Sequence, residues 1–179
     1  MLPSQAPAAK EITWLAQLSQ LGQLPLGWQS WLEEEGSLTL RLKHQAKQSF
    51  SVNLLLEEPT LPCQNELDLL GISHQECWVR QVYLEVDNQP WVFDRSVMHL
   101  ANLSPTARQL IQVGNQPLGH LLFANPQVKR GPLVFCQPNQ LNLPSLWGRA
   151  SCFSSPTGKI LVTEHFLHPM ASQLKLPLE

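Results

Sequence analysis

The run C-W-V-R-Q-V-Y-L-E-V, residues 77–86, constrains the fold of this chain more than any other segment. It is rich in β-branched and aromatic residues and has no Gly or Pro, which is typical of a β-strand. Because strand side chains alternate between two faces, Arg80 shares a face with Trp78, Val82 and Leu84. A buried guanidinium keeps its proton and is costly unless an anion pairs with it. The strand therefore predicts that the protein or a ligand supplies an anion to Arg80.

The surrounding sequence predicts a mixed domain around this strand. Asp87-Asn88-Gln89-Pro90 is turn chemistry, so the run over Trp91–His99 is expected to return as a hairpin. A second hairpin is expected where S-S-P-T-G joins Leu146–Phe153 to Lys159–His168. Two further strands are expected over Gln48–Glu57 and Val128–Cys136, and helices over Glu11–Leu21, Leu26–Glu34, Ser37–His44, Ser104–Gly114 and a short stretch from Pro117. Pro59–Gly71 is expected to be a loop with one helical turn. The class is α+β, with six mostly antiparallel strands.

The composition indicates one compact domain over residues 1–179, in which residues 1–9 form a frayed tail. Only 15% of the residues are charged and 43% are hydrophobic, which favours a strongly buried fold. The net charge is −2 and no Lys/Arg run occurs, so nucleic acid is not an expected partner. We see no signal peptide, no membrane span and no C-x-x-C among the four cysteines. These features predict a cytoplasmic protein with free thiols, and we expect a monomer.

Charged side chains also lie on apolar faces of other strands. Glu164 shares a face with Ile160 and Val162, and could form a buried salt bridge with Arg80. The alternative, left open by these residues, is that both line a ligand site. Arg95 and Arg149 lie among aromatic residues of their own strands, and each alone is explained by stacking on a neighbouring indole. If all three arginines point inward, the excess of cations suggests a small anionic ligand, because a guanidinium grips a carboxylate at two points.

Two predicted helix starts could add hydrogen-bond donors to such a site. If Pro117 is the first helical residue, the amide of Leu118 is among the free N–H groups of that helix. The amide of Leu38 has the same position after the Ser37 cap. Both amides could point at an anion, although water or a cap commonly satisfies such groups. A metal site is not expected, since no H-E-x-x-H is present, and neither a Walker motif nor G-x-G-x-x-G indicates a nucleotide cofactor.

Five short motifs in a fixed order resemble one enzyme family. They are W-V-R at 78–80, P-W-V-F-D-R-S-V-M at 90–98, Q-P-L-G-H-L-L-F at 116–123, L-W-G-R at 146–149 and L-V-T-E-H-F-L at 161–167. Their order and spacing resemble chorismate pyruvate-lyase, which makes 4-hydroxybenzoate and pyruvate from chorismate for ubiquinone biosynthesis. The resemblance covers roughly residues 30–169. It implies a six-stranded antiparallel sheet with helices and flaps that close over an internal site, and neither metal nor cofactor.

The resemblance also implies roles for individual residues. Arg80 corresponds to the arginine that holds the ring carboxylate, and Glu164 to the glutamate near the ring hydroxyl. Leu118 corresponds to the leucine that acts through its backbone. Leu38 stands where the family has methionine, a change that a backbone contact should tolerate. Asp94 stands where some relatives have Gly. Arg95 and Arg149 are further candidates for the enolpyruvyl carboxylate.

Two other functions fit parts of the same pattern. The implied fold resembles the effector-binding domains of bacterial repressors, so a non-catalytic module that binds a small aromatic acid is the alternative. Repressors of that kind carry a basic DNA-binding domain ahead of the sheet, and the N-terminal segment here is short and not basic. A structural domain with a buried Arg–Glu bridge and no ligand is the third interpretation. Turnover of chorismate separates the first function from both.

Overall fold

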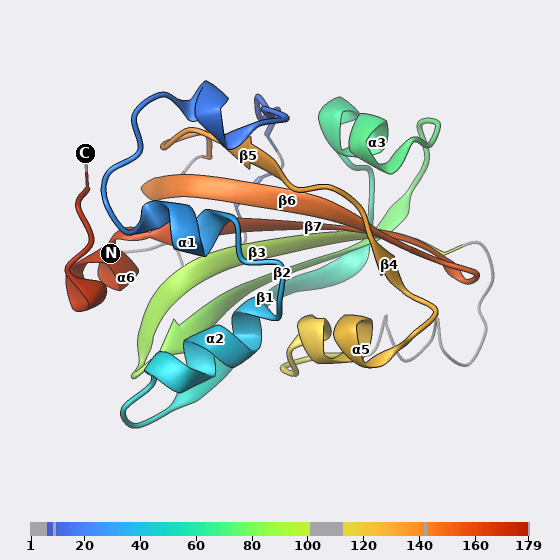
Figure 1. The fold of residues 1–179 in the computed structure, drawn as a ribbon. Helices are drawn as coiled ribbons and strands as arrows, with labels where there is room; N and C mark the ends of the chain where they lie inside the picture. Colours follow the sequence, from blue (N-terminus) through green and yellow to red (C-terminus); the bar gives the residue numbers. More distant parts are fainter. Residues whose placement is uncertain (1–6, 9, 101–112, 142, 179) are drawn as a thin grey trace.

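The computed structural model describes residues 7–8, 10–100, 113–141 and 143–178. Its centre is a seven-stranded sheet, in which every strand pair is antiparallel (Figure 1). The strand order is β1-β2-β3-β7-β6-β4, and β5 also pairs with β6. The strands are β1 (Phe50–Thr60), β2 (Cys77–Val86), β3 (Gln89–Leu100), β4 (Lys129–Arg130), β5 (Val134–Cys136), β6 (Ser145–Ser155) and β7 (Gly158–Leu167). The predicted α+β class is confirmed.

Short helices cover the two faces of the sheet. In Figure 1, α1, α2 and α5 lie in front of the strands, whereas α3 and the N-terminal segment lie at the opposite side. The helical elements are the 3₁₀ turn η1 (Leu18–Leu21), α1 (Trp28–Leu32), α2 (Leu38–Gln45), α3 (Gln64–Leu70), α5 (Leu118–Ala124) and α6 (His168–Leu174). The largest apolar cluster packs α1 and α2 against the sheet, with Trp28 and Leu32 fully buried. On this face, the first residues of α2 and α5 lie over the strands.

Both predicted hairpins are present, and their turns have the expected chemistry. Asp87 and Asn88 have positive φ angles of 50° and 63°, as a tight two-residue hairpin turn requires. The Asp87 carboxylate also accepts hydrogen bonds from the backbone amides of residues 47–49. At the second hairpin, Gly158 has φ of 143°, and a Cβ there would approach the His99 carbonyl oxygen to 2.2 Å. Only glycine fits this position without displacing backbone.

Several predicted elements differ from the structure. The predicted helix over Glu11–Leu21 is wrong: only η1 is helical, and Leu15 exchanges two backbone hydrogen bonds with Phe135. This segment is extended because it adds a bridge beside β5. The predicted strand Val128–Cys136 is two strands, β4 and β5, separated by Gly131 and Pro132, and this gives the seventh strand.

The bounds of other elements also differ from the predicted ones. β1 continues to Thr60, and the predicted loop Pro59–Gly71 contains the two-turn helix α3. Glu66 accepts the amide of Cys63 at the start of α3, and Gly71 ends it with a left-handed conformation. α6 follows β7 without a gap and was not predicted. The predicted helix Ser104–Gly114 falls mainly on residues 101–112, outside the described residues.

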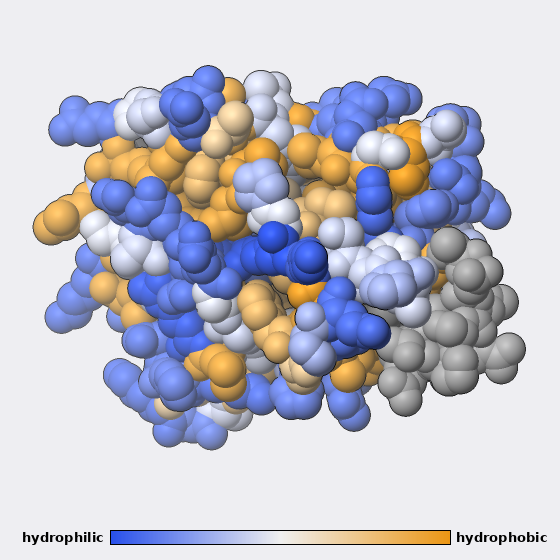
Figure 2. All heavy atoms as spheres, turned by 45° about the vertical axis from the view of Figure 1, so that its right-hand side comes forward, coloured by the Kyte–Doolittle hydropathy of each residue, from blue (hydrophilic) through white to orange (hydrophobic). Residues whose placement is uncertain are grey.

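The surface carries scattered apolar side chains. On the face in Figure 2, hydrophobic patches are interrupted by hydrophilic groups. Among the large exposed hydrophobic residues, only Leu121 and Phe123 share an element, α5; the full set is Leu26, Leu40, Leu61, Leu121, Phe123 and Leu178. Every helix in the described ranges is too short or too polar to cross a lipid bilayer. The four cysteines are free.

Candidate active site

The strand register gathers charged side chains on one face of the sheet. Glu57 pairs with Arg80, Asp94 pairs with Glu164, and Glu164 pairs with Arg149. Directly paired residues of antiparallel strands point to the same face. A row of charged side chains therefore crosses β1, β2, β3, β7 and β6, with two carboxylates, Asp94 and Glu164, side by side at its centre. It lies under α2 and α5, which present only uncharged residues to it.

Arg80 is 1% exposed, as its place on an apolar strand face requires. Its Nη2 donates to the carbonyl oxygens of Gly114 and Gln116, at 2.7 and 2.8 Å. Its Nε lies 3.7 Å from the Glu57 carboxylate, too far for a hydrogen bond, and has no other acceptor among the described residues. The Arg80–Glu164 salt bridge, one of the two alternatives left open by the sequence, does not form, because each residue has a different partner. Arg80 thus keeps donor capacity beside a cavity.

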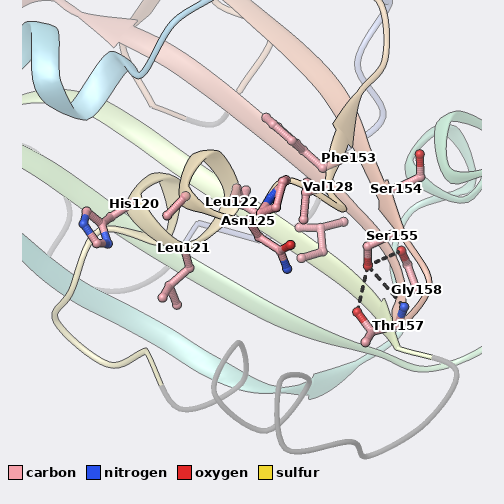
Figure 3. A pocket seen from close by; sticks show the side chains of 13 residues that line it. His120, Leu121, Leu122, Asn125, Val128, Phe153, Ser154, Ser155, Thr157 and Gly158 are labelled. Atoms are coloured by element: carbon pink, nitrogen blue, oxygen red, sulfur yellow. Dashed lines mark hydrogen bonds between the residues drawn. The ribbon is translucent and has the colours of Figure 1, made fainter.

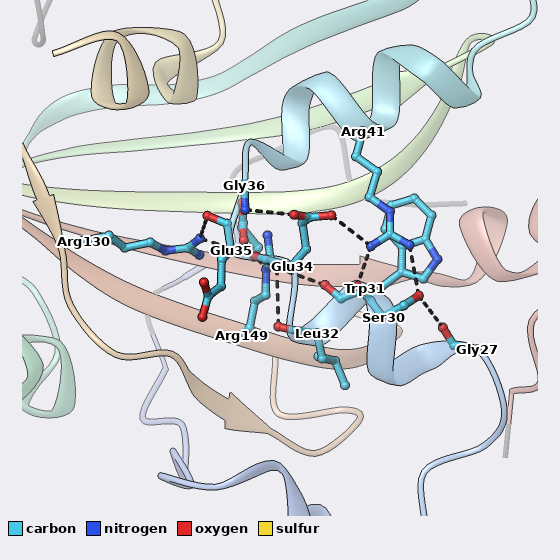
Figure 4. A network of polar contacts seen from close by, with 11 residues as sticks. Gly27, Ser30, Trp31, Leu32, Glu34, Glu35, Gly36, Arg41, Arg130 and Arg149 are labelled. Carbon is cyan, nitrogen blue, oxygen red and sulfur yellow. Dashed lines mark hydrogen bonds and ion pairs between the residues drawn. The ribbon is translucent and has the colours of Figure 1, made fainter. Parts of the chain in front are cut away.

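Glu164 is paired with Arg149. The Arg149 Nε donates to Glu164 Oε2 at 2.6 Å, and Nη1 donates to the carbonyls of Trp31 and Glu34 at 2.9 and 2.7 Å. These carbonyls belong to the end of α1 and the loop that follows it, where cationic donors are favourable (Figure 4). Arg149 therefore fixes both the Glu164 carboxylate and the loop that leads into α2.

Arg130 is part of the same arrangement, and sequence reasoning missed it. Its Nε donates to Ser151 Oγ at 2.8 Å, and its Nη1 donates to the Glu35 carbonyl at 2.9 Å (Figure 4). Residue 130 lies in a strand of two residues, which is too short for alternation to reveal. Arg130 and Arg149 hold the loop between α1 and α2 against the sheet.

Asp94 is the other charged residue that sequence reasoning did not assign to the site. It is 8% exposed, and Ser96 Oγ donates to its Oδ1 at 3.0 Å. Burial and then repulsion by Glu164 raise the pKa of Asp94 to about 7, although Arg80 and the Ser96 hydrogen bond act in the opposite direction. Asp94 can therefore change its charge near neutral pH.

A small, mostly enclosed cavity lies among these side chains and brings five predicted residues together: Leu38, Arg80, Leu118, Arg149 and Glu164. Its volume is about 30 Å³, which is room for about two waters. Ser37 caps α2, so Leu38 is its first helical residue. Pro117 is the N-cap of α5, not its first residue, so Leu118 takes that place. Both amides belong to the unpaired first turns of their helices, at the cavity wall.

Arg95 is not at this cavity. Its Nε and Nη2 donate to the two carboxylate oxygens of Glu66 at 2.6 and 3.0 Å, a two-point pair on the other face of the sheet. The cause is a register shift between Leu84 and Glu85, which pairs Arg80 with Ser96 and Gln81 with Arg95. The assignment of Arg95 as a candidate ligand for an anionic substrate is therefore wrong.

A larger pocket of about 360 Å³ lies between α5 and the β6–β7 hairpin (Figure 3). Its described walls are mainly aliphatic and aromatic groups, and their polar side chains are His120, Asn125, Ser154, Ser155 and Thr157. It shares Leu122 and Phe153 with the small cavity. No arginine, lysine or carboxylate among the described residues lines it. The smaller cavity therefore has guanidinium groups that can bind an anion, whereas the polar groups on the described walls of the larger pocket are an imidazole, an amide and hydroxyls.

The described residues contain no group of three or more His, Cys, Asp or Glu side chains that could hold a metal ion. The site is thus a set of fixed charges and amides. It can bind and orient carboxylates, Glu164 can accept a hydrogen bond, and Asp94 can hold a proton near neutral pH.

Comparisons with known proteins point to one family. The chorismate lyase family model matches residues 8–175. "Probable chorismate pyruvate-lyase 2" of Pseudomonas entomophila is 37% identical over 93% of this chain and 94% of that relative. "Probable chorismate pyruvate-lyase" of Chromohalobacter salexigens is 36% identical over 92% and 93%.

A solved structure of a "possible transcriptional regulator YydK" from Bacillus subtilis is a distant likeness. It has a TM-score of 0.46 and 10% identity, and the match covers 69% of this chain and 60% of that chain. That score supports no argument, whereas the sequence matches span nearly the whole chain. The chain belongs to the chorismate lyase family.

Proposed function

We propose that this protein eliminates pyruvate from chorismate to give 4-hydroxybenzoate, and that the reaction takes place in the cavity beside Arg80. The observation that carries the proposal is the convergence of Arg80, Glu164 and the starts of α2 and α5 on one buried cavity in a member of this family. These groups match the substrate class, since chorismate carries two carboxylates and a ring hydroxyl.

The reaction needs positioning more than chemical machinery. The ether C–O bond to the ring breaks, a ring hydrogen ends on the enolpyruvyl carbon, and the ring becomes aromatic, which supplies the driving force. The protein must hold the two carboxylates, orient the ether and exclude water. A small, mostly enclosed cavity lined by charged side chains suits these tasks.

Each site residue has a role in this scheme. Arg80 binds the ring carboxylate through its free donor capacity, helped by the amides of Leu38 and Leu118. Glu164, held by Arg149, accepts a hydrogen bond from the ring hydroxyl. Arg149 or Arg130 meets the enolpyruvyl carboxylate, because both guanidiniums line the cavity.

The size of the cavity implies movement during turnover. About 30 Å³ is far smaller than chorismate, so α2 or α5 must shift for the substrate to enter. The same closure would hold the aromatic product after the reaction. We therefore expect product release to be slower than the chemical step.

Incubation of the purified protein with chorismate, without added metal, tests the proposal. Equal amounts of 4-hydroxybenzoate and pyruvate, above the spontaneous background, are the expected result by chromatography. Glu85→Gln is a suitable control, since Glu85 bonds Ser51 and Asn53 away from the cavity. No product, with a rise in melting temperature on adding 4-hydroxybenzoate, would instead identify a binding module.

The cellular setting is part of the proposal. We propose a cytoplasmic monomer whose 4-hydroxybenzoate enters ubiquinone biosynthesis. Four free cysteines suit a reducing compartment. Light scattering on the purified protein measures the oligomeric state.

A further inference from the structure

Asp94 lies between the two residues proposed to grip the substrate. It pairs directly with Glu164 across β3 and β7, and with Val82 across β2 and β3, two residue pairs from Arg80–Ser96 and on the same face. All three side chains line the small cavity. A ligand held by Arg80 and Glu164 is therefore also next to Asp94.

The charges around the cavity nearly cancel when Asp94 is ionised. Arg80, Arg130 and Arg149 line the cavity with Asp94 and Glu164, and the Glu57 carboxylate stands 3.7 Å behind Arg80. With three cations against three carboxylates, a closed cavity has no net charge to offset an incoming anion. Placing a carboxylate beside an ionised, buried Asp94 is costly because the local dielectric is low.

We propose that Asp94 takes up a proton from solvent when an aromatic carboxylate binds, so that the occupied site contains a neutral Asp94 and a net positive charge. The proposal rests on the proposed function, because it uses the same cavity for the same ligand. The proton returns to solvent when the ligand leaves.

The groups that face Asp94 from neighbouring elements favour this protonation. Glu164 on β7 repels the ionised form, and burial disfavours it further. Arg80 on β2 and the Ser96 hydroxyl oppose these effects. In the free site, the neutral and the ionised form of Asp94 are therefore both populated near neutral pH. Residues of α2 and α5 that line the cavity are uncharged. An added ligand carboxylate therefore shifts the balance toward the acid.

Calorimetric titration with 4-hydroxybenzoate in phosphate and in Tris at the same pH tests the proposal. The difference in heat between buffers measures the protons taken up. At about pH 7.5 the wild-type protein should take up a substantial fraction of one proton, and its affinity should fall by up to about tenfold per pH unit above neutrality. Asp94→Asn should bind with almost no buffer dependence and a flat pH profile. Glu85→Gln should behave as the wild type.

The outcomes separate the two proposals. Binding of 4-hydroxybenzoate without proton uptake would overturn the role of Asp94 and leave the lyase proposal intact. Equal uptake in Asp94→Asn and the wild type would also overturn it. No binding together with no turnover of chorismate would overturn both. An infrared difference spectrum of the wild type needs no variant: ligand binding should add a protonated carboxyl band, and its absence contradicts the proposal.

Discussion

The two faces of the sheet both bury arginine, and they use it in opposite ways. On the face away from α2 and α5, Arg95 binds both oxygens of Glu66, and the pair is complete. On the face under those helices, Arg80 donates to two backbone carbonyls and faces Glu57 at a distance too long for a hydrogen bond. Arg80 therefore keeps donor capacity for a ligand, whereas Arg95 has given its Nε and Nη2 to one protein carboxylate.

Substitution of Arg80 should have the largest effect on activity of any change on either face. Arg80→Ala is expected to fold and to lose about 10³-fold in kcat/KM, as removal of a buried charge pair to the ligand would predict. Steady-state assays with chorismate, with circular dichroism as the check on folding, measure this. Turnover like that of the wild type in a folded Arg80→Ala protein would refute the assignment.

Arg95→Ala should give the reverse result. Loss of this partner leaves the Glu66 carboxylate buried and unpaired, so the free energy of unfolding should fall by about 3–5 kcal/mol. The folded fraction should keep kcat/KM within about twofold, because the cavity is on the other face. Urea unfolding and assays of the same samples measure both quantities. The double variant Arg95→Met/Glu66→Gln, which keeps an oxygen to accept the Cys63 amide, should recover most of the lost stability, and failure to do so would show that the pair has another role.

The faces should also differ in how pH affects stability. The pKa of Asp94 is raised to about 7, so the folded state holds the extra proton and stability falls as pH rises from about 4 to 7. Burial lowers the pKa of His165, on the other face, to about 3, so the unfolded state holds the extra proton and stability falls as pH drops below about 6.5.

Two variants measure these contributions separately. Relative to the wild type, Asp94→Asn should gain stability as pH rises from 4 to 7 and then stay constant. The deficit of His165→Gln should shrink as pH falls from 6.5 toward 3. Thermal unfolding over this pH range is the measurement, and parallel curves for variant and wild type would show that the group in question does not titrate differently on folding.

Leu38→Met should have the smallest effect. If Leu38 acts through its backbone amide, the side chain only needs to fill a buried position, and this exchange costs less than about 1.5 kcal/mol. Activity should stay within about twofold of the wild type. A much larger loss, measured at saturating and at low chorismate, would show that the side chain itself contacts the substrate.

Alternation along single strands predicted much of the site. Arg80 and Glu164 were placed on inward faces from their neighbours in the sequence, and the helix starts at Leu38 and Leu118 followed from Ser37 and Pro117. These inferences need only local periodicity and capping rules. The same rules predicted both hairpins and their turns.

The register between strands could not be predicted from these local rules. A regular hairpin after the Asp87–Asn88 turn would oppose Arg80 to Arg95, but the bulge at Leu84/Glu85 shifts β3 by one residue. A shift of one residue exchanges the faces of every following side chain. It moves Arg95 away from the cavity and brings Asp94 to it. The Arg80–Glu57 pairing likewise depends on a register between segments far apart in the sequence.

The two hydrogen bonds from Arg80 to the carbonyls of Gly114 and Gln116 have a consequence for how occupancy can be detected. The side chain that is to grip the ligand also fastens the backbone just before α5. An anion that binds Arg80 therefore changes the strength of its hydrogen bonds to this backbone. Amide hydrogen exchange over residues 113–124 should then report, from outside the closed cavity, whether a ligand is inside.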